Sequence, residues 1–424
     1  ELAIQECLRL GITTFHDAGS GQDYIDRLLR FKEQGRLKIR TYTMLSGRQP
    51  QLLEEWYKKG PMIDPDHRVT VRAIKLHCDG ALGSRGAWLL EEYSDRPGHF
   101  GHETLPMETV SEVSEKAIPA GFQVCSHAIG DRANREVLDR YEMAFDKFPD
   151  VDRKSLRFRI EHAQHLSLED IERFGEMNIV AAMQAIHMSS DRPWAIDRLG
   201  ERRIVEGAYV WQKLMEAGAT VCNGTDAPVE PLDPLPSFYA SVSRKTLQGT
   251  PEGGYEADQA MTRAQALKSY TLDGAYAEFE EDFKGSIEVG KAADFTVFDK
   301  NTEMTEKIVS IGVPDLIEHQ DQLLGEIHRL KGFENVTIDQ VINQTTGIPQ
   351  KTLLPILMRS DAQKATDEKE TKAIEEDRKA RGIKPGEGFS MSASDEVAKS
   401  LEGTMGYRIG QINPDMLVSA MTNL

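Results

Sequence analysis

The sequence predicts an α/β fold, a (β/α)8 barrel of the TIM type that lacks its first strand. From residue 2 to residue 299, short β-branched runs alternate with longer amphipathic stretches, which is typical of βα units in a parallel sheet. The pattern contains seven strands, whereas a closed barrel of this type needs eight. A helical stretch, Leu2–Leu10, precedes the first of the seven. An open, doubly wound sheet is the alternative that the pattern alone leaves open.

Each strand is predicted where an apolar, β-branched run is bounded by turn residues. The seven runs are Gly11–Ala18, Leu37–Leu45, Val69–Asp79, Gly121–Ala128, Leu156–Ala163, Ile179–His187 and Ala219–Ala227. The clearest helical patterns are Ser111–Ala120, Arg132–Phe148, Ser167–Met177, Ile204–Ala217 and Thr262–Phe279. Ser167 and Asp170 form a capping-box pattern at a helix start, and Gly121 and Gly218 stand where helices should end.

The character of the chain changes after the barrel pattern. Gly285–Lys300 has the pattern of two strands joined by a turn. Pro314–Phe333 has an amphipathic helical pattern, and Ala362–Arg381 is a dense mixture of charged residues. We therefore predict an incomplete barrel over residues 1–280, a small separate element over 281–300, and an unassigned, largely helical or partly disordered region over 301–424.

The composition excludes several classes of partner. The chain has 69 acidic and 51 basic residues, a net charge of −18, which argues against nucleic acid or an anionic membrane. No stretch approaches the ~18–20 apolar residues that would cross a bilayer. We expect a small-molecule substrate as the partner, with no nucleic acid and no membrane, and self-association into a homo-oligomer stays open.

The four cysteines are far apart and form no CxxC pair, which is typical of buried, reduced thiols in a cytoplasmic protein. The chain begins with Glu1 inside a helical pattern and not with Met. We therefore expect a truncated sequence whose natural N-terminus lies upstream, so the question of a signal peptide stays open.

Polar side chains stand at the ends of four predicted strands. Lys75 lies within the third strand, His127 ends the fourth, His162 ends the fifth and Asp226 ends the seventh. Each alone is a weak signal, because a single histidine after a strand is more often a hydrogen-bonded loop residue than a ligand. In a parallel barrel, however, chemistry gathers at the carboxyl ends of the strands. Together these nitrogen and oxygen groups predict a site for a divalent cation.

Several segments resemble the metal-dependent amidohydrolase superfamily, and most of all the amidohydrolase family 3 branch, which includes the N-substituted formamide deformylases. The resemblance covers roughly residues 1–300, and its strength comes from several motifs in the same order. The similar segments are residues 74–87 (IKLHCDGALGSRGA), 123–139, 157–166, 218–234 (GATVCNGTDAPVEPLDP), 262–277 and 284–299.

The resemblance implies a set of metal ligands and shows what is missing from it. The matching positions are Lys75, His127, His162 and Asp226, and the implied metal is one or two divalent ions, with zinc favoured and Lys75 a candidate for carbamylation. The family's first-strand His-x-His pair occurs nowhere in the 424 residues. The family also closes with a small β-sandwich, of which residues 281–300 would be a remnant.

The implied reaction is hydrolysis of a non-peptide, amide-type carbon–nitrogen bond in a small molecule. Asp226 would be the catalytic residue that takes a proton from water and returns it to the leaving amine. Glu161 would stand behind His162 as a supporting partner. The expected substrate contacts, for which loop salt bridges and caps are an equal alternative, are Asp79, Arg85, Asp131 and Arg132. An inactive fragment or scaffold protein is the competing hypothesis, because the His-x-His ligands are absent, and another reaction on the same barrel is a third.

Overall fold

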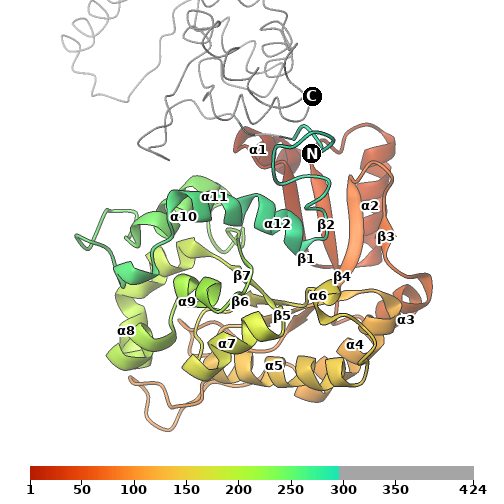
Figure 1. Ribbon diagram of the computed structural model, residues 1–424. Coiled ribbons are helices and arrows are strands. Elements are labelled where there is room, and N and C mark those ends of the chain that lie inside the picture. Colours follow the sequence, from red (N-terminus) through yellow and green to blue (C-terminus); the bar gives the residue numbers. More distant parts are fainter. Residues whose placement is uncertain (295, 297–424) are drawn as a thin grey trace, which may run out of the picture. The chain divides into compact units, whose positions relative to one another are not determined.

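The computed structural model describes residues 1–294 and 296 (Figure 1). The chain divides into two compact units, Glu1–Ser286 and Ile287–Leu424. The first unit contains the whole sheet and all the helices described below, and it is treated by itself. The region predicted over residues 301–424 lies outside the described residues.

Seven parallel strands form one curved sheet, in the order in which they occur along the chain. All seven predicted strands are confirmed, most of them with narrower limits. They are β1 Thr14–Ser20, β2 Arg40–Ser46, β4 Val69–His77, β5 Gln123–Ala128, β6 Arg159–His162, β7 Val180–Met183 and β8 Val221–Asn223. A two-residue strand, β3 Met62–Ile63, pairs antiparallel with β4 and is too short for any periodicity to predict.

The order of the strands decides between the two predicted architectures. A doubly wound sheet reverses its strand order at a switch point, whereas here each parallel strand pairs with its neighbours in sequence from β1 to β8. Within the described residues, β1 and β8 are the two ends of the path and do not pair with each other. The sheet is therefore a part-barrel of seven parallel strands, which confirms the predicted (β/α)8-type barrel without one strand.

Helices follow most strands, and most of them cover the outer face of the sheet, whereas the last one packs against its inner face (Figure 1). They are α1 Leu2–Arg9, α2 Gln22–Glu33, α3 Pro50–Lys59, α4 Met107–Ala120, α5 Asp131–Asp146, α6 Arg153–Leu156, α7 Leu168–Glu176, α8 Ala185–Gly207, α9 Trp211–Glu216, α10 Pro234–Ser243, α11 Arg263–Tyr270 and α12 Leu272–Ala277, with a 3-10 turn at Ala257–Gln259.

Local capping signals act as predicted. The Ser167 side chain accepts a hydrogen bond from the Asp170 backbone at the start of α7. Gly121 ends α4 in the left-handed conformation, with φ of 81°, and Gly218 follows α9 with φ of 88°. These three positions show that the element limits are encoded locally.

Three predicted elements were wrong in extent. The predicted helix Ile204–Ala217 is two helices, because Ala208 adopts an extended backbone directly after α8 ends at Gly207. Gly207 lies so close to Leu166 that an added Cβ would be 1.7 Å from its carbonyl oxygen. The helix predicted over Thr262–Phe279 is interrupted at Thr271 between α11 and α12. The sixth predicted strand stops at Met183, so that His187 lies in the first turn of α8.

Most of the core lies between the strands and the outer helices. Inside the curve of the sheet are two smaller apolar clusters, one of Tyr42, Met44, Ala73 and Cys125, the other of Val180, Ala182, Cys222 and Ala277. Burying each large apolar side chain stabilises the fold by roughly 1.5–3 kcal/mol. Because Ala277 ends α12, the last helix closes against the inner surface of the sheet. The four cysteines are buried and free, as predicted.

The segment after α12 does not show the predicted strand pair where it is described. Residues 285–294 form turns and bends without a strand. Residues 295 and 297–300 lie outside the described residues, so the assignment of 281–300 to a small β-sandwich stays a prediction. None of the helices in the part of the chain that the structure describes combines the length and the apolar character needed to cross a membrane.

Candidate active site

The carboxyl ends of β5 and β6 bring two of the predicted ligands into contact. The strands pair so that His127 is level with Glu161, and Ala128 with His162. The rings of His127 and His162 pack edge to face, with centroids 4.4 Å apart. The predicted histidine pair is therefore one compact unit at one edge of the sheet.

Two further histidines extend this pair, and sequence reasoning missed both as site residues. The ring of His77, at the end of β4, is 5.9 Å from that of His127. The ring of His187, in α8, is 5.9 Å from that of His162. His77 lies two residues after Lys75, and this period of two along a strand is the signal that places both on one face. His187 was predicted at the end of the sixth strand and interpreted as a loop or rim residue, whereas the structure places it in the first turn of α8.

Asp226 joins the row of histidines at its far end. Its Oδ2 atom lies 4.0 Å from Nε2 of His187, in the turn that follows β8. Asp226 has φ of 57° and His162 has φ of 79°, a region that residues other than glycine rarely adopt. Strained backbone of this kind clusters at functional sites, where surrounding structure holds it in place.

The ring of His162 is held in one orientation by the α8 cap residue. Nδ1 of His162 lies 2.6 Å from Oε1 of Gln184, so this nitrogen carries the hydrogen and Nε2 keeps its lone pair. Burial, together with the charges of His127 and Lys75, lowers the pKa of His162 well below its ordinary value. A neutral imidazole with a fixed tautomer is the form that binds a metal ion.

Asp79 supports His127 from the start of the β4–α4 loop. Its carboxylate accepts hydrogen bonds from the backbone nitrogens of Trp88, Ile129 and Gly130, and its Oδ1 lies 3.3 Å from Nε2 of His127. This Nε2 is buried and has no hydrogen-bond partner of good geometry. The predicted substrate contact at Asp79 is thus, in the structure, a buried carboxylate that anchors two loops next to His127.

Lys75 and Glu161 lie inside the curve of the sheet. Lys75 is 4% exposed, and burial lowers its pKa, while the charge of Glu161 acts in the opposite direction. Glu161 pairs with Arg159, whose Nη2 lies 2.9 Å from its Oε1. Burial raises the pKa of Asp226, although Lys75 and His127 oppose this. The four predicted ligands therefore share one electrostatic environment.

The other predicted substrate contacts are bound to protein groups. Arg85 makes a two-pronged ion pair with Asp95 in the β4–α4 loop. Asp131 accepts from the Leu90 backbone and lies 3.4 Å from His165, at the start of α5. The guanidinium of Arg132 lies over the Trp88 ring, 5.6 Å from its centroid. A role for these three in substrate binding stays a prediction.

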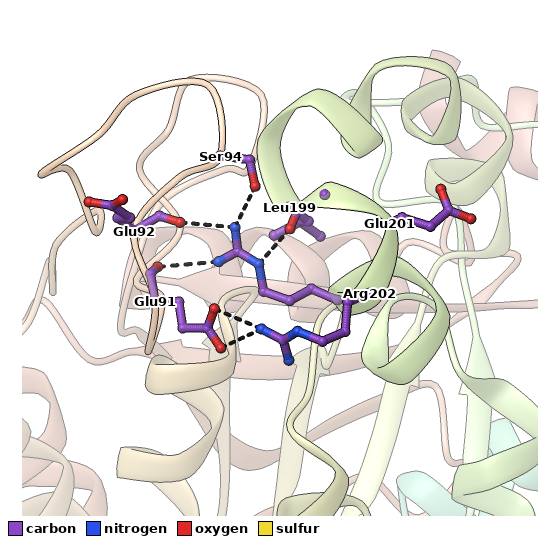
Figure 2. A pocket seen from close by; sticks show the side chains of 8 residues that line it. Glu91, Glu92, Ser94, Leu199, Glu201 and Arg202 are labelled. Carbon is purple, nitrogen blue, oxygen red and sulfur yellow. Dashed lines mark hydrogen bonds and ion pairs between the residues drawn. The ribbon is translucent and has the colours of Figure 1, made fainter.

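A surface pocket of about 310 Å³ lies apart from these residues, and none of them lines it. Figure 2 shows its lining, in which the guanidinium of Arg203 donates to the carbonyl groups of Glu92 and Leu199 and to the Ser94 hydroxyl. These bonds tie the β4–α4 loop to α8 near Gly200, where a φ of 74° kinks the helix. The pocket is thus built around a structural arginine whose donors are already engaged.

The residues at the strand ends fit a divalent cation in their chemistry. Gln184 bonds to Nδ1 of His162 and leaves its Nε2 available, and Nε2 of His187 is buried without a hydrogen-bond partner. Within residues 1–294 and 296, however, no three His, Cys, Asp or Glu side chains converge at the geometry of a metal site. The predicted ligands therefore supply suitable donor atoms at one edge of the sheet, but in the described residues these atoms do not surround a single point at metal-binding distances.

Comparison with known proteins identifies the family. The amidohydrolase family model matches residues 1–318. The chain belongs to the amidohydrolase family. This confirms the resemblance found in the sequence, and it agrees with a parallel, barrel-type sheet whose polar residues stand at the strand ends.

Individual relatives of this amidohydrolase chain agree with the family assignment. Protein LONG AFTER FAR-RED 3 of Arabidopsis thaliana is 33% identical over 311 residues, which cover 71% of this chain and 52% of the relative. The N-substituted formamide deformylase of Arthrobacter pascens is 27% identical over 204 residues, 48% of this chain and 36% of the relative. The chain thus spans about half the length of the Arabidopsis protein.

A solved structure shows the same fold. An uncharacterised metal-dependent hydrolase from Pyrococcus furiosus superposes with a TM-score of 0.61 and 29% identity, covering 71% of this chain and 59% of that one. The amidohydrolase barrel predicted from the sequence is therefore supported by the family match and by the structural similarity.

Proposed function

We propose that this amidohydrolase chain carries the barrel of a metal-dependent hydrolase that cleaves an amide-type carbon–nitrogen bond in a small molecule. The observation that carries the proposal is the contact of His127 with His162, whose ring centroids are 4.4 Å apart at the carboxyl ends of β5 and β6. The family match, the metal-dependent hydrolase from Pyrococcus and the formamide deformylase support the same chemistry.

The proposed ligands are Lys75, His127, His162 and Asp226, and the proposed ion is zinc, which imidazole and carboxylate groups favour. A divalent cation bound there would supply a water molecule of lowered pKa and would polarise a carbonyl group. The protein's part is orientation. Gln184 fixes the tautomer of His162, and Asp79 lies against His127 within ion-pair distance.

Asp226 is the proposed proton carrier. Burial raises the pKa of its carboxyl, which brings it closer to the range in which a carboxylate takes a proton from water and returns it to an amine. It is also partly open to solvent, with 37% of its side chain exposed, so that a substrate can reach it. Nε2 of His187 lies 4.0 Å from the Asp226 carboxylate.

Lys75 has two candidate roles that a mass measurement separates. A buried amine with a lowered pKa is neutral more often, and a neutral amine reacts with CO₂ to form a carbamate and release a proton. The carbamate would be an oxygen ligand. As a cation, Lys75 would instead bind a substrate carboxylate or carbonyl. Native mass spectrometry in bicarbonate buffer would detect the carbamate as one added CO₂ that Lys75→Met abolishes.

One observation favours a second candidate, an inactive scaffold. The 424 residues contain no His-x-His pair, which the family resemblance leads us to expect as ligands. Under this alternative the same barrel would be retained without turnover. Metal binding and hydrolysis must therefore be measured separately.

The experiment uses the purified 424-residue chain, stripped of metal and reloaded with Zn²⁺ or Co²⁺. Binding is measured by calorimetry, and amine release is measured from an N-benzyl formamide and from the matching acetamide. We expect metal-dependent release that Asp226→Asn abolishes, with metal binding weakened but retained because three proposed ligands remain. Full metal occupancy without release from either amide would favour the scaffold, and the absence of metal binding would overturn the proposed function.

A further inference from the structure

A line of buried polar contacts crosses the inside of the part-barrel. It begins with Glu278, just after α12, whose Oε1 lies 2.8 Å from Nζ of Lys284. The other carboxylate oxygen of Glu278 lies 3.3 Å from Nε2 of His16 in β1. Glu278 is only 3% exposed, so its charge requires these partners. Figure 1 shows the end of α12 beside β1, where this contact is made.

The line continues through His16 to the strand that carries the candidate ligands. Nη1 of Arg159, in β6, donates to Nδ1 of His16 at 3.1 Å. Nε2 of His16, the atom that faces Glu278, is therefore the nitrogen that carries a hydrogen toward the carboxylate. The His16 ring is thus held between a cation on one side and an anion on the other.

Arg159 connects His16 to Glu161, the residue before His162. Nη2 of Arg159 donates to Oε2 of Glu161 at 3.2 Å and lies 2.9 Å from Oε1. Oε1, the oxygen nearer to Arg159, is buried and accepts no hydrogen bond of good geometry, so the ion pair with Arg159 is its contact. The Glu161 carboxylate is also the strongest opposite charge acting on Lys75.

We propose that Glu278 is a positioning residue of the candidate active site, which acts through His16 and Arg159 to hold the carboxylate of Glu161, the residue before His162. Lys284, Glu278, Arg159 and Glu161 alternate in charge, and His16 bridges the middle. The line cannot carry protons through Arg159, because a guanidinium keeps its proton. It holds charge in place, and so makes the site depend on a segment 117 residues beyond Glu161 (278 minus 161).

Glu280 provides a matched control. It is also buried, at 5% exposed, and also pairs with Lys284, whose Nζ is 2.6 Å away. Its other partners are His67 at 3.0 Å and Thr70 at 3.2 Å, and among the described residues none of these contacts leads toward Glu161. Glu278→Gln and Glu280→Gln therefore remove the same charge next to the same lysine, but only the first cuts the line.

The test measures the Co²⁺ dissociation constant and visible absorption of the whole chain, together with the ¹⁵N shifts of the His16 ring. Only the Co²⁺ measurements rest on the proposed function. We expect Glu278→Gln to weaken Co²⁺ binding by about three- to tenfold, below the loss of 10–100-fold typical of direct ligand partners. We expect it also to change the Co²⁺ spectrum and the His16 ¹⁵N shifts, and Glu280→Gln to change none of these.

His16→Phe is the second variant, in case Glu278→Gln does not fold. The new ring keeps the packing against Tyr42, whose centroid is 5.3 Å away, but loses both polar contacts. It should reproduce the Co²⁺ effect. Equal Co²⁺ binding in Glu278→Gln, His16→Phe and wild type, or equal weakening by Glu280→Gln, overturns the positioning role. If wild type binds no Co²⁺, the proposed function fails. The positioning role is then tested by double-mutant cycles on the free energy of unfolding. It requires the coupling energy between Glu278→Gln and Glu161→Gln to exceed that between Glu280→Gln and Glu161→Gln.

Discussion

Nδ1 of His162 lies 2.6 Å from Oε1 of Gln184, which links the end of β6 to the start of α8. The two residues are 22 positions apart in the sequence and belong to successive strand–helix units. This contact keeps a lone pair on Nε2 of His162, and the metal-binding role proposed for that nitrogen depends on it.

Replacing Gln184 should therefore weaken metal binding without unfolding the protein. For Gln184→Ala we expect a 10–100-fold rise in the Zn²⁺ dissociation constant, as is usual when a ligand loses its orienting partner. Gln212→Ala is the control, because Gln212 bonds to Ala260 and Gln265 away from the site. Calorimetric titration of both variants checks the prediction, and a similar change in the two would contradict it.

Stability should fall in acid because of Glu278. Burial alone would raise the pKa of this carboxyl, but His16 and Lys284 outweigh it and lower the pKa to about 2. The ionised form therefore stabilises the folded state above the unfolded pKa near 4.5, and this contribution is lost as the pH falls toward 2. The shift corresponds to about 3 kcal/mol at neutral pH, of which roughly 2 kcal/mol should be lost by pH 3.

Urea unfolding at pH 7 and pH 3, followed by tryptophan fluorescence, measures this effect. All four tryptophans lie in the first unit, so the signal reports that unit. The difference between wild type and Glu278→Gln should be large at pH 7 and small at pH 3. An equal difference at both pH values would show that Glu278 does not titrate as described.

The hydroxyl of Tyr141 should contribute to stability, whereas that of Tyr57 should not. Tyr141 donates to Ser126 Oγ at 2.7 Å inside the protein, next to the strands of the site. The Tyr57 hydroxyl is buried without a hydrogen-bond partner. We expect Tyr141→Phe to lower the free energy of unfolding by about 1–2 kcal/mol and Tyr57→Phe to be neutral or stabilising. The reverse order of the two variants would contradict the bonding shown here.

Gly130 should tolerate no side chain. An added Cβ would lie 2.0 Å from the Trp88 carbonyl oxygen, although the φ of −76° is ordinary. The clash alone should cost about 1–3 kcal/mol in Gly130→Ala. In Gly274→Ala, by contrast, the Cβ meets nothing within 4 Å inside α12, and the better helix propensity should add about 0.5–1 kcal/mol. Thermal unfolding of the two variants should therefore shift in opposite directions.

The fold was predictable because its signals are local. Strands β4 and β5 appear as β-branched runs, and Ser167 and Gly121 mark helix limits through their own conformational preferences. The break after Gly207 was not predicted, and the close approach of the Leu166 carbonyl to this glycine comes from the fold. The predicted site residues were found at strand ends, but Arg85 is paired within its own loop.

By itself the sequence determined the alternation of strands and helices, the placement of Lys75, His127, His162 and Asp226 at strand ends, and the family. Only the tertiary structure decided which side chains support them. Gln184 reaches His162, and Arg159 meets His16 across 143 residues of sequence. Such contacts depend on the register and curvature of the whole sheet, which no local pattern of residues encodes.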